Sequence, residues 1–133
     1  MPNAFIFDYA IIRVVPRVER GEFFNAGVIL FCATQGFLGA KIELDAPKLN
    51  AFAPQLDARV VEEHLQTISL ICDGVGPIGQ MSRRERFHWL VAPRSTIIQV
   101  SPVHSGCCDD LEAALEHLFE ALVRPVEVGN CEK

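Results

Sequence analysis

Polar and charged side chains gather in the stretch RVERGEFFN, residues 17–25, which follows an apolar segment that ends at Pro16. Together with the last residues of that segment, the stretch supplies guanidinium, carboxylate and amide groups on Arg13, Arg17, Arg20, Glu22 and Asn25. A guanidinium presents a planar fork of N–H donors that matches a carboxylate or a phosphate. Because polar residues at strand ends are held by a rigid sheet, we predict an anion-binding or partner-binding site here. The alternative is a solvated turn in which arginines and glutamates pair with one another, while Asn25 and Gly27 accommodate a bulge.

A second polar group follows in APRSTIIQVSPVH, residues 92–104, on Arg94, Ser95, Thr96, Gln99 and His104. Gln99 and Ser101 share the parity of Ser95 in a predicted strand, so one face of that strand is polar. A merely exposed strand face has the same pattern, and this alternative stays open. The two polar groups can form one site only if the strand 95–101 lies beside the first strand of the chain. We predict that it does.

Catalytic and metal-binding arrangements receive little support from the spacing of the candidate residues. Ser101 and His104 combine a nucleophile with a base, but no G-x-S-x-G turn is present to position a serine. Adjacent Cys107 and Cys108 are a poor clamp for one tetrahedral ion, and no matching C-x-x-C pair exists. A nuclease that holds a divalent cation would use carboxylates such as those of Glu19, Glu22 and Asp45. Neighbouring arginines neutralise these acids more simply, so we predict no metal and no cofactor, and we assign no catalytic residue.

The net charge of −5 comes entirely from the last 25 residues, which hold seven acidic and two basic side chains. Residues 1–108 hold ten of each kind. Arginines on both sides of Trp89 form a local basic patch on which single-stranded nucleic acid could stack. Because the domain around that patch is neutral, we do not expect nucleic acid as a partner.

The composition and the N-terminal residues indicate in which cellular compartment the protein is expected. Half of the residues are hydrophobic and 22% are charged, which is typical of a globular protein. No apolar run approaches the ~18 residues that cross a bilayer, and Asp8 stands where a signal peptide would be apolar. We therefore expect a cytoplasmic protein without a membrane anchor. The five cysteines show no disulfide spacing and are expected to be reduced, with Cys32 and Cys72 in the core.

Hydrophobic periodicity predicts four strands, over residues 4–15, 26–33, 37–44 and 95–101. The uninterrupted apolar run of the second strand is typical of a central strand covered on both faces. In the third strand, Lys41 and Glu43 alternate with apolar residues and are predicted to point outward.

Two main helices are predicted over residues 57–74 and 109–123, capped by Asp57 and Asp109, and Glu112 completes a capping box with Asp109. A helical turn is expected between the prolines of DAPKLNAFAP. Ser82 and Glu85 have capping-box spacing, which favours a short helix over 82–91. Alternating apolar residues in the same stretch keep a strand open as the alternative.

This order of elements predicts an α+β fold, with a single mostly antiparallel sheet of about four strands and two main helices packed on one face. The length predicts one domain over residues 1–125, followed by a flexible acidic tail over 126–133. An unpaired outer strand would also allow two copies to form a homodimer through their sheets.

Two stretches together resemble a bacterial family catalogued as domain of unknown function number 3037, namely YAIIRVVPRVERGEFFNAGVILF (9–31) and RFHWLVAPRSTIIQVSPVHSG (86–106). Members of that family are single-domain proteins of about this length, so the resemblance spans nearly the whole chain. It implies no activity, because the family has none assigned. It does imply a protein partner, because genes of this family often neighbour genes for kinase-like proteins.

We therefore expect a non-enzymatic interaction or regulatory module that binds a protein partner or a small anionic ligand through the connections 13–25 and 93–104. The alternative is a small enzyme, similar to a phosphodiesterase or a nuclease, that acts on a phosphate-containing substrate at the same place. The sequence leaves open whether the chain is an enzyme.

Overall fold

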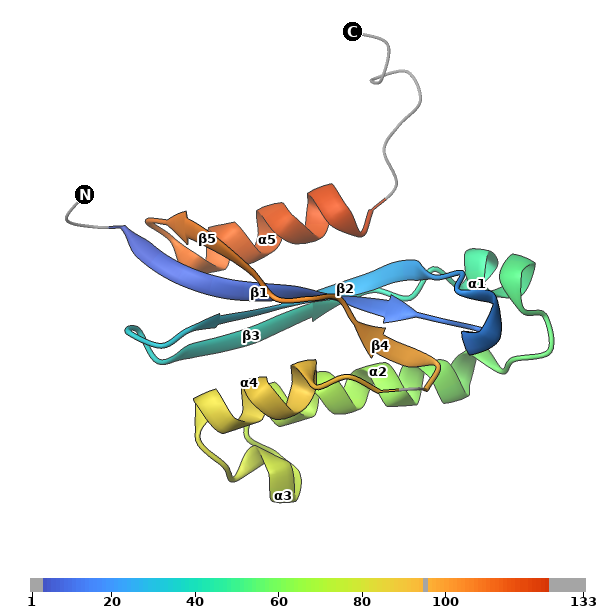
Figure 1. The fold of residues 1–133 in the computed structure, drawn as a ribbon, viewed down its shortest axis with the longest axis horizontal. Helices are drawn as coiled ribbons and strands as arrows, with labels where there is room; N and C mark the ends of the chain where they lie inside the picture. Colours follow the sequence, from blue (N-terminus) through green and yellow to red (C-terminus); the bar gives the residue numbers. More distant parts are fainter. Residues whose placement is uncertain (1–3, 95, 125–133) are drawn as a thin grey trace, which may run out of the picture.

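Five strands form one antiparallel sheet in the computed structural model, which describes residues 4–94 and 96–124 (Figure 1). The strands are β1 (Phe5–Val14), β2 (Phe24–Cys32), β3 (Phe37–Ile42), β4 (Ile98–Val100) and β5 (His104–Cys108). The predicted α+β class and the antiparallel sheet are confirmed. The predicted tail over 126–133 and the candidate residue Ser95 lie outside the described residues.

Strand β1 organises the sheet, because its two halves have different neighbours. Along one side it pairs with β2, which in turn pairs with β3. Along the other side, Phe5–Tyr9 pair with β5 and Ile12–Val14 pair with β4. The predicted contact between the first strand and the strand 95–101 is therefore confirmed. Strand β5 was not predicted, since its sequence HSGCC is short and has no apolar alternation.

The described residues also form five helices and one 3₁₀ turn: η1 (Val18–Arg20), α1 (Ala46–Phe52), α2 (Ala58–Cys72), α3 (Gly76–Gly79), α4 (Arg83–Val91) and α5 (Leu111–Leu122). Ser82 and Glu85 make both hydrogen bonds of a capping box, so the helix prediction for 82–91 is confirmed. The predicted cap of the last helix was wrong by one residue. Asp110 accepts the hydrogen bond from the backbone of Ala113, so Asp109 and Glu112 form no capping box.

Helices cover both faces of the sheet, and the prediction that both main helices share one face was wrong (Figure 1). Ile29 and Phe31 of β2 pack in the cluster that includes α2 and α4, whereas Val28 and Leu30 pack in the cluster that includes α5. Because successive side chains of a strand point to opposite faces, a strand that is apolar at every position needs a cover on each side. The burial of β2 on both faces was predicted correctly from its sequence. The prediction did not draw the consequence that α5 must cover the face opposite α2.

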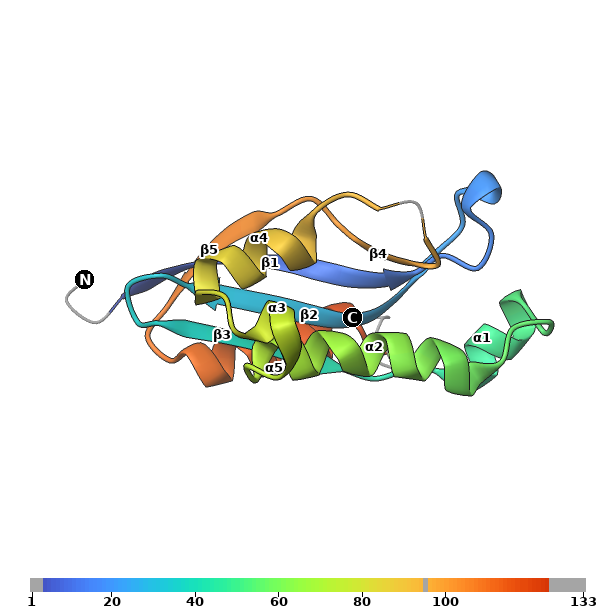
Figure 2. The same ribbon diagram turned by 90° about the horizontal axis from the view of Figure 1, so that it is seen from below.

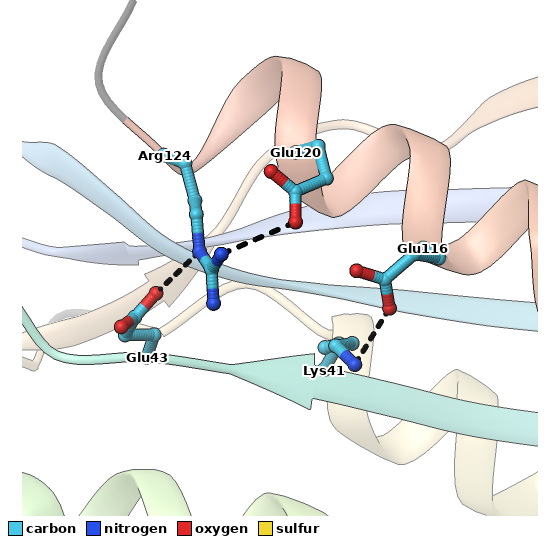
Figure 3. A network of polar contacts seen from close by, with 5 residues as sticks. All are labelled: Lys41, Glu43, Glu116, Glu120 and Arg124. Carbon is cyan, nitrogen blue, oxygen red and sulfur yellow. Dashed lines mark hydrogen bonds and ion pairs between the residues drawn. The ribbon is translucent and has the colours of Figure 1, made fainter.

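Helix α5 is held over β3 by ion pairs (Figure 3). Lys41 lies 2.6 Å from Glu116, and Arg124 lies 2.9 Å from Glu43 and 3.3 Å from Glu120. Lys41 and Glu43, which were predicted to point outward, thus lie on the face that α5 covers. They pair with charged residues at that edge of the sheet. No helix among the described residues is long and apolar enough to cross a membrane.

Candidate functional site

Three polar side chains form a row across neighbouring strands. Arg13 of β1 stands opposite Asn25 of β2 and opposite Gln99 of β4. The register shifts between Ile12 and Arg13, which is the bulge expected near Asn25 and Gly27. Register partners point to the same face of a sheet. That face is the one covered by α5, because Asn25 Nδ2 donates a hydrogen bond to the carbonyl oxygen of Leu122, 2.9 Å away at the helix end.

Arg13 is the residue of this row with an unusual environment. Its guanidinium carbon lies 4.2 Å from the centre of the Phe23 ring, a distance typical of a cation–π contact. Its Nε atom is buried and has no hydrogen-bond partner in the part of the chain that the structure describes, although buried donors in proteins are nearly always paired. Leaving a donor of a charged group unpaired costs a few kcal/mol.

The other charged residues of the 13–25 connection lie on its exposed part. Gly21 ends the 3₁₀ turn with a φ of 71°, a left-handed conformation that favours glycine. Arg20 and Glu22 on either side of it form two hydrogen bonds of 2.9 and 3.0 Å. These bonds hold the pKa of the Glu22 carboxyl below its usual value. The geometry of Arg20 and Glu22 thus matches the alternative of a solvated turn in which arginines and glutamates pair with one another. The guanidinium of Arg17, earlier in the same connection, is exposed.

Arg94 forms hydrogen bonds with backbone carbonyls at the C-terminal end of α4. Its guanidinium donates hydrogen bonds to the carbonyl oxygens of Leu90 (3.1 Å), Ala92 (3.3 Å) and Trp89 (2.6 Å), and it stacks 4.3 Å from the centre of the Trp89 ring. A cation in this position satisfies helix carbonyls and is favoured by the helix dipole. The predicted basic patch around Trp89 is smaller in the structure, because Arg94 is bound to helix carbonyls and Arg86 is buried.

The two predicted connections meet at one end of the sheet (Figure 2). The backbone N–H of Val15 donates to the carbonyl oxygen of Ile97 across a distance of 2.7 Å. The side chains nevertheless divide between two surfaces. Arg13, Asn25 and Gln99 share the α5 face, whereas Arg94 and Thr96 line a groove on the α2 face, and the lining of that groove includes no residue from 13–25.

His104 is separated from both groups. It pairs with Tyr9 at the start of β5, with the two rings 5.4 Å apart. Tyr9 and Arg13 are four residues apart on β1, which is about 13 Å along a strand. The groove itself was missed by sequence reasoning, because His64 and Thr67 lie on α2, far from Arg94 in the chain. Their exposed positions on an amphipathic helix gave no sign of a groove.

A family model described as "Protein of unknown function (DUF3037)" matches residues 9–123 of the chain. The chain belongs to this family. The match includes both connections and runs from β1 to the end of α5, so the DUF3037 domain and the described sheet coincide almost completely. Searches of curated proteins and of solved structures found no match.

The cysteines of the DUF3037 domain differ in burial, and therefore in the expected reactivity of their thiols. Cys32 is fully buried, and burial raises the pKa of the Cys72 thiol to about 12. Both were predicted to be core residues, and both pack there. Cys107, by contrast, is exposed on β5. Within residues 4–94 and 96–124, no cluster of three His, Cys, Asp or Glu side chains could hold a metal ion.

Alkylation is therefore expected to proceed much faster at Cys107 than at Cys72. A pKa of about 12 leaves roughly one Cys72 thiol in ten thousand ionised at pH 8, and only the thiolate reacts. Iodoacetamide treatment of the native protein, followed by peptide mass spectrometry, measures the two rates. Unfolding in guanidinium chloride is the control and should make the rates similar. Equal rates in the native protein would contradict the burial of Cys72.

Proposed function

We propose that this DUF3037 domain is a non-enzymatic interaction module, and that it binds an acidic segment of a partner protein around Arg13. The observation that carries the proposal is the buried Arg13 Nε, which has no hydrogen-bond partner among residues 4–94 and 96–124. A carboxylate of the partner would supply the missing acceptor. Arginine suits this role because its planar fork binds both oxygens of a carboxylate at once.

The surroundings of Arg13 support a protein as the partner. Phe23, against which the guanidinium stacks, is 44% exposed, and Val18 is exposed to the same degree. Arginine and aromatic residues are enriched at the centres of protein interfaces, where they contribute most of the binding energy.

The sheet beneath Arg13 supports a preformed site. Its strand neighbours Ile12 and Val14 are fully buried on the opposite face, and Asn25 is tied to α5 through its amide. A side chain that projects from such a strand has little freedom to lose on binding, which favours affinity.

Affinity purification of the tagged chain from its native host, with the variant Arg13→Met, tests the proposal. The matched control is Arg59→Met, which removes an exposed guanidinium from α2 on the other face. We expect a stoichiometric partner that binds directly once both proteins are purified, and that cross-links to 13–25 through an acidic segment. Arg13→Met should weaken this binding at least tenfold and reduce its salt dependence, whereas Arg59→Met should not.

Two results would overturn the proposal. Equal binding by the wild type and Arg13→Met would show that the partner uses another surface. Turnover of a phosphodiester or nucleotide by the purified chain, dependent on a divalent cation and abolished by Arg13→Met, would instead support the enzyme alternative.

A further inference from the structure

A groove lies between α2, α4 and β4, on the face of the sheet opposite Arg13. Its volume is about 240 Å³. Its walls are mainly aliphatic and come from Ile68, Ile71, Leu90, Ile97, Ile98 and Val100. The polar lining consists of His64 and Thr67 from α2, Arg94 and Thr96 from the segment after α4, and the indole of Trp89. Apolar walls with a few polar groups are typical of small-molecule sites.

The positive charge in the lining of the groove favours an anionic ligand. Arg94 is the permanently charged side chain of the groove, and its lining contains no carboxylate. A guanidinium has five N–H donors, and the three carbonyl bonds of Arg94 involve only Nη1 and Nη2. Its Nε–H makes none of these bonds. The same bonds and the stacking on Trp89 hold the group at the groove, so that it is preorganised for an anion.

The volume limits the size of the ligand. At about 240 Å³, the groove is smaller than the ~300–1,000 Å³ of typical ligand pockets, so it suits a small ligand. We propose that it binds a small amphipathic carboxylate, a short aliphatic or single-ring acid. The apolar body of this acid packs between Ile68, Leu90 and Val100, and its carboxylate accepts a hydrogen bond from Arg94. This site is separate from the partner surface around Arg13, and either could exist without the other.

Trp89 gives a direct measurement of this binding, because it is the only tryptophan of the chain and it lines the groove. Hexanoate is the probe, with hexanol and hexylamine as neutral and cationic analogues of the same length. We expect saturable change of the tryptophan fluorescence with hexanoate, at least tenfold weaker binding of hexanol and none of hexylamine. Binding of hexanoate no tighter than that of hexanol would overturn the role of Arg94.

A variant that fills the groove provides the second measurement. Thr67→Trp places a large ring at the mouth of the groove, and Gln66→Trp places the same ring on a neighbouring exposed position of α2 that lies outside it. Because both variants add a second fluorophore, hexanoate binding is measured by calorimetry. We expect Thr67→Trp to abolish binding and Gln66→Trp to preserve it. Unchanged binding by Thr67→Trp would overturn the site, as would amide chemical-shift changes in the wild type centred on Arg13 rather than on the groove.

Discussion

Replacement of Arg86 by methionine is expected to lower the free energy of unfolding by about 3 kcal/mol, and the melting temperature by about 10 °C. Arg86 of α4 is 8% exposed, and its Nη1 donates to the carbonyl oxygens of Ile71 (2.8 Å) and Cys72 (3.0 Å) at the end of α2. Its Nε donates to the carbonyl oxygen of Met81 at 3.0 Å. One guanidinium thus caps α2 and joins it to the segment that leads into α4. Methionine fills a similar volume but leaves three carbonyls without this donor.

Chemical denaturation followed by circular dichroism measures this loss. Arg83→Met is the matched control, because Arg83 begins the same helix but its side chain is exposed. The control should unfold within about 0.5 kcal/mol of the wild type. A stability of Arg86→Met equal to that of Arg83→Met would mean that the end of α2 does not depend on this arginine.

Replacement of Gly27 by alanine is expected to destabilise the domain by about 3 kcal/mol. Gly27 lies on the central strand β2, and a Cβ atom there would stand 2.7 Å from the backbone carbonyl oxygen of Lys41 on β3. It would also lie 3.0 Å from side-chain atoms of Ile12 and Ile42. Because the nearest atom belongs to the backbone of a paired strand, the sheet itself would have to widen. The reason for glycine here is the close approach of two strands rather than an unusual φ.

Gly39→Ala is the matched control for Gly27→Ala. At Gly39, on β3, the three atoms nearest to a Cβ atom would be side-chain atoms of Phe37 and Leu115, at 3.2 to 3.4 Å. These side chains can move by a few tenths of an ångström, so we expect a much smaller loss of stability. Urea denaturation curves of the two variants give the comparison. The expectation for Gly27 fails if its variant unfolds at the same midpoint as Gly39→Ala.

Hydrogen bonding separates the arginines of this DUF3037 domain by role. Arg86 and Arg94 bind helix carbonyls, and Arg20 pairs with Glu22. Arg13 differs from them, because it combines a stacked guanidinium with a buried Nε for which the described residues supply no acceptor. Residue type alone does not distinguish these cases, because all four side chains carry the same guanidinium group. The candidate partner surface is therefore defined by unsatisfied hydrogen bonding rather than by the number of arginines.

The sequence by itself determined the local structure. The capping box at Ser82, the cap at Asp57 and the full burial of β2 were all predictable, because caps and periodicity depend on residues close together in the chain. Even the contact between the first strand and the strand 95–101 was predicted. The strand β5 was not, because its five residues lack a pattern of their own and are held in the sheet by pairing with β1.

Only the tertiary structure decided how the helices are distributed and which polar groups share a surface. Helix α5 lies on the opposite face from α2 because β2 is apolar on both sides, and either helix could have provided either cover. The row of Arg13, Asn25 and Gln99 depends on a bulge and on strand register, whereas Arg94 reaches the other face through the end of α4. A shift of one residue in a strand moves each of its side chains to the other face, so neighbouring residues in the sequence can serve different surfaces.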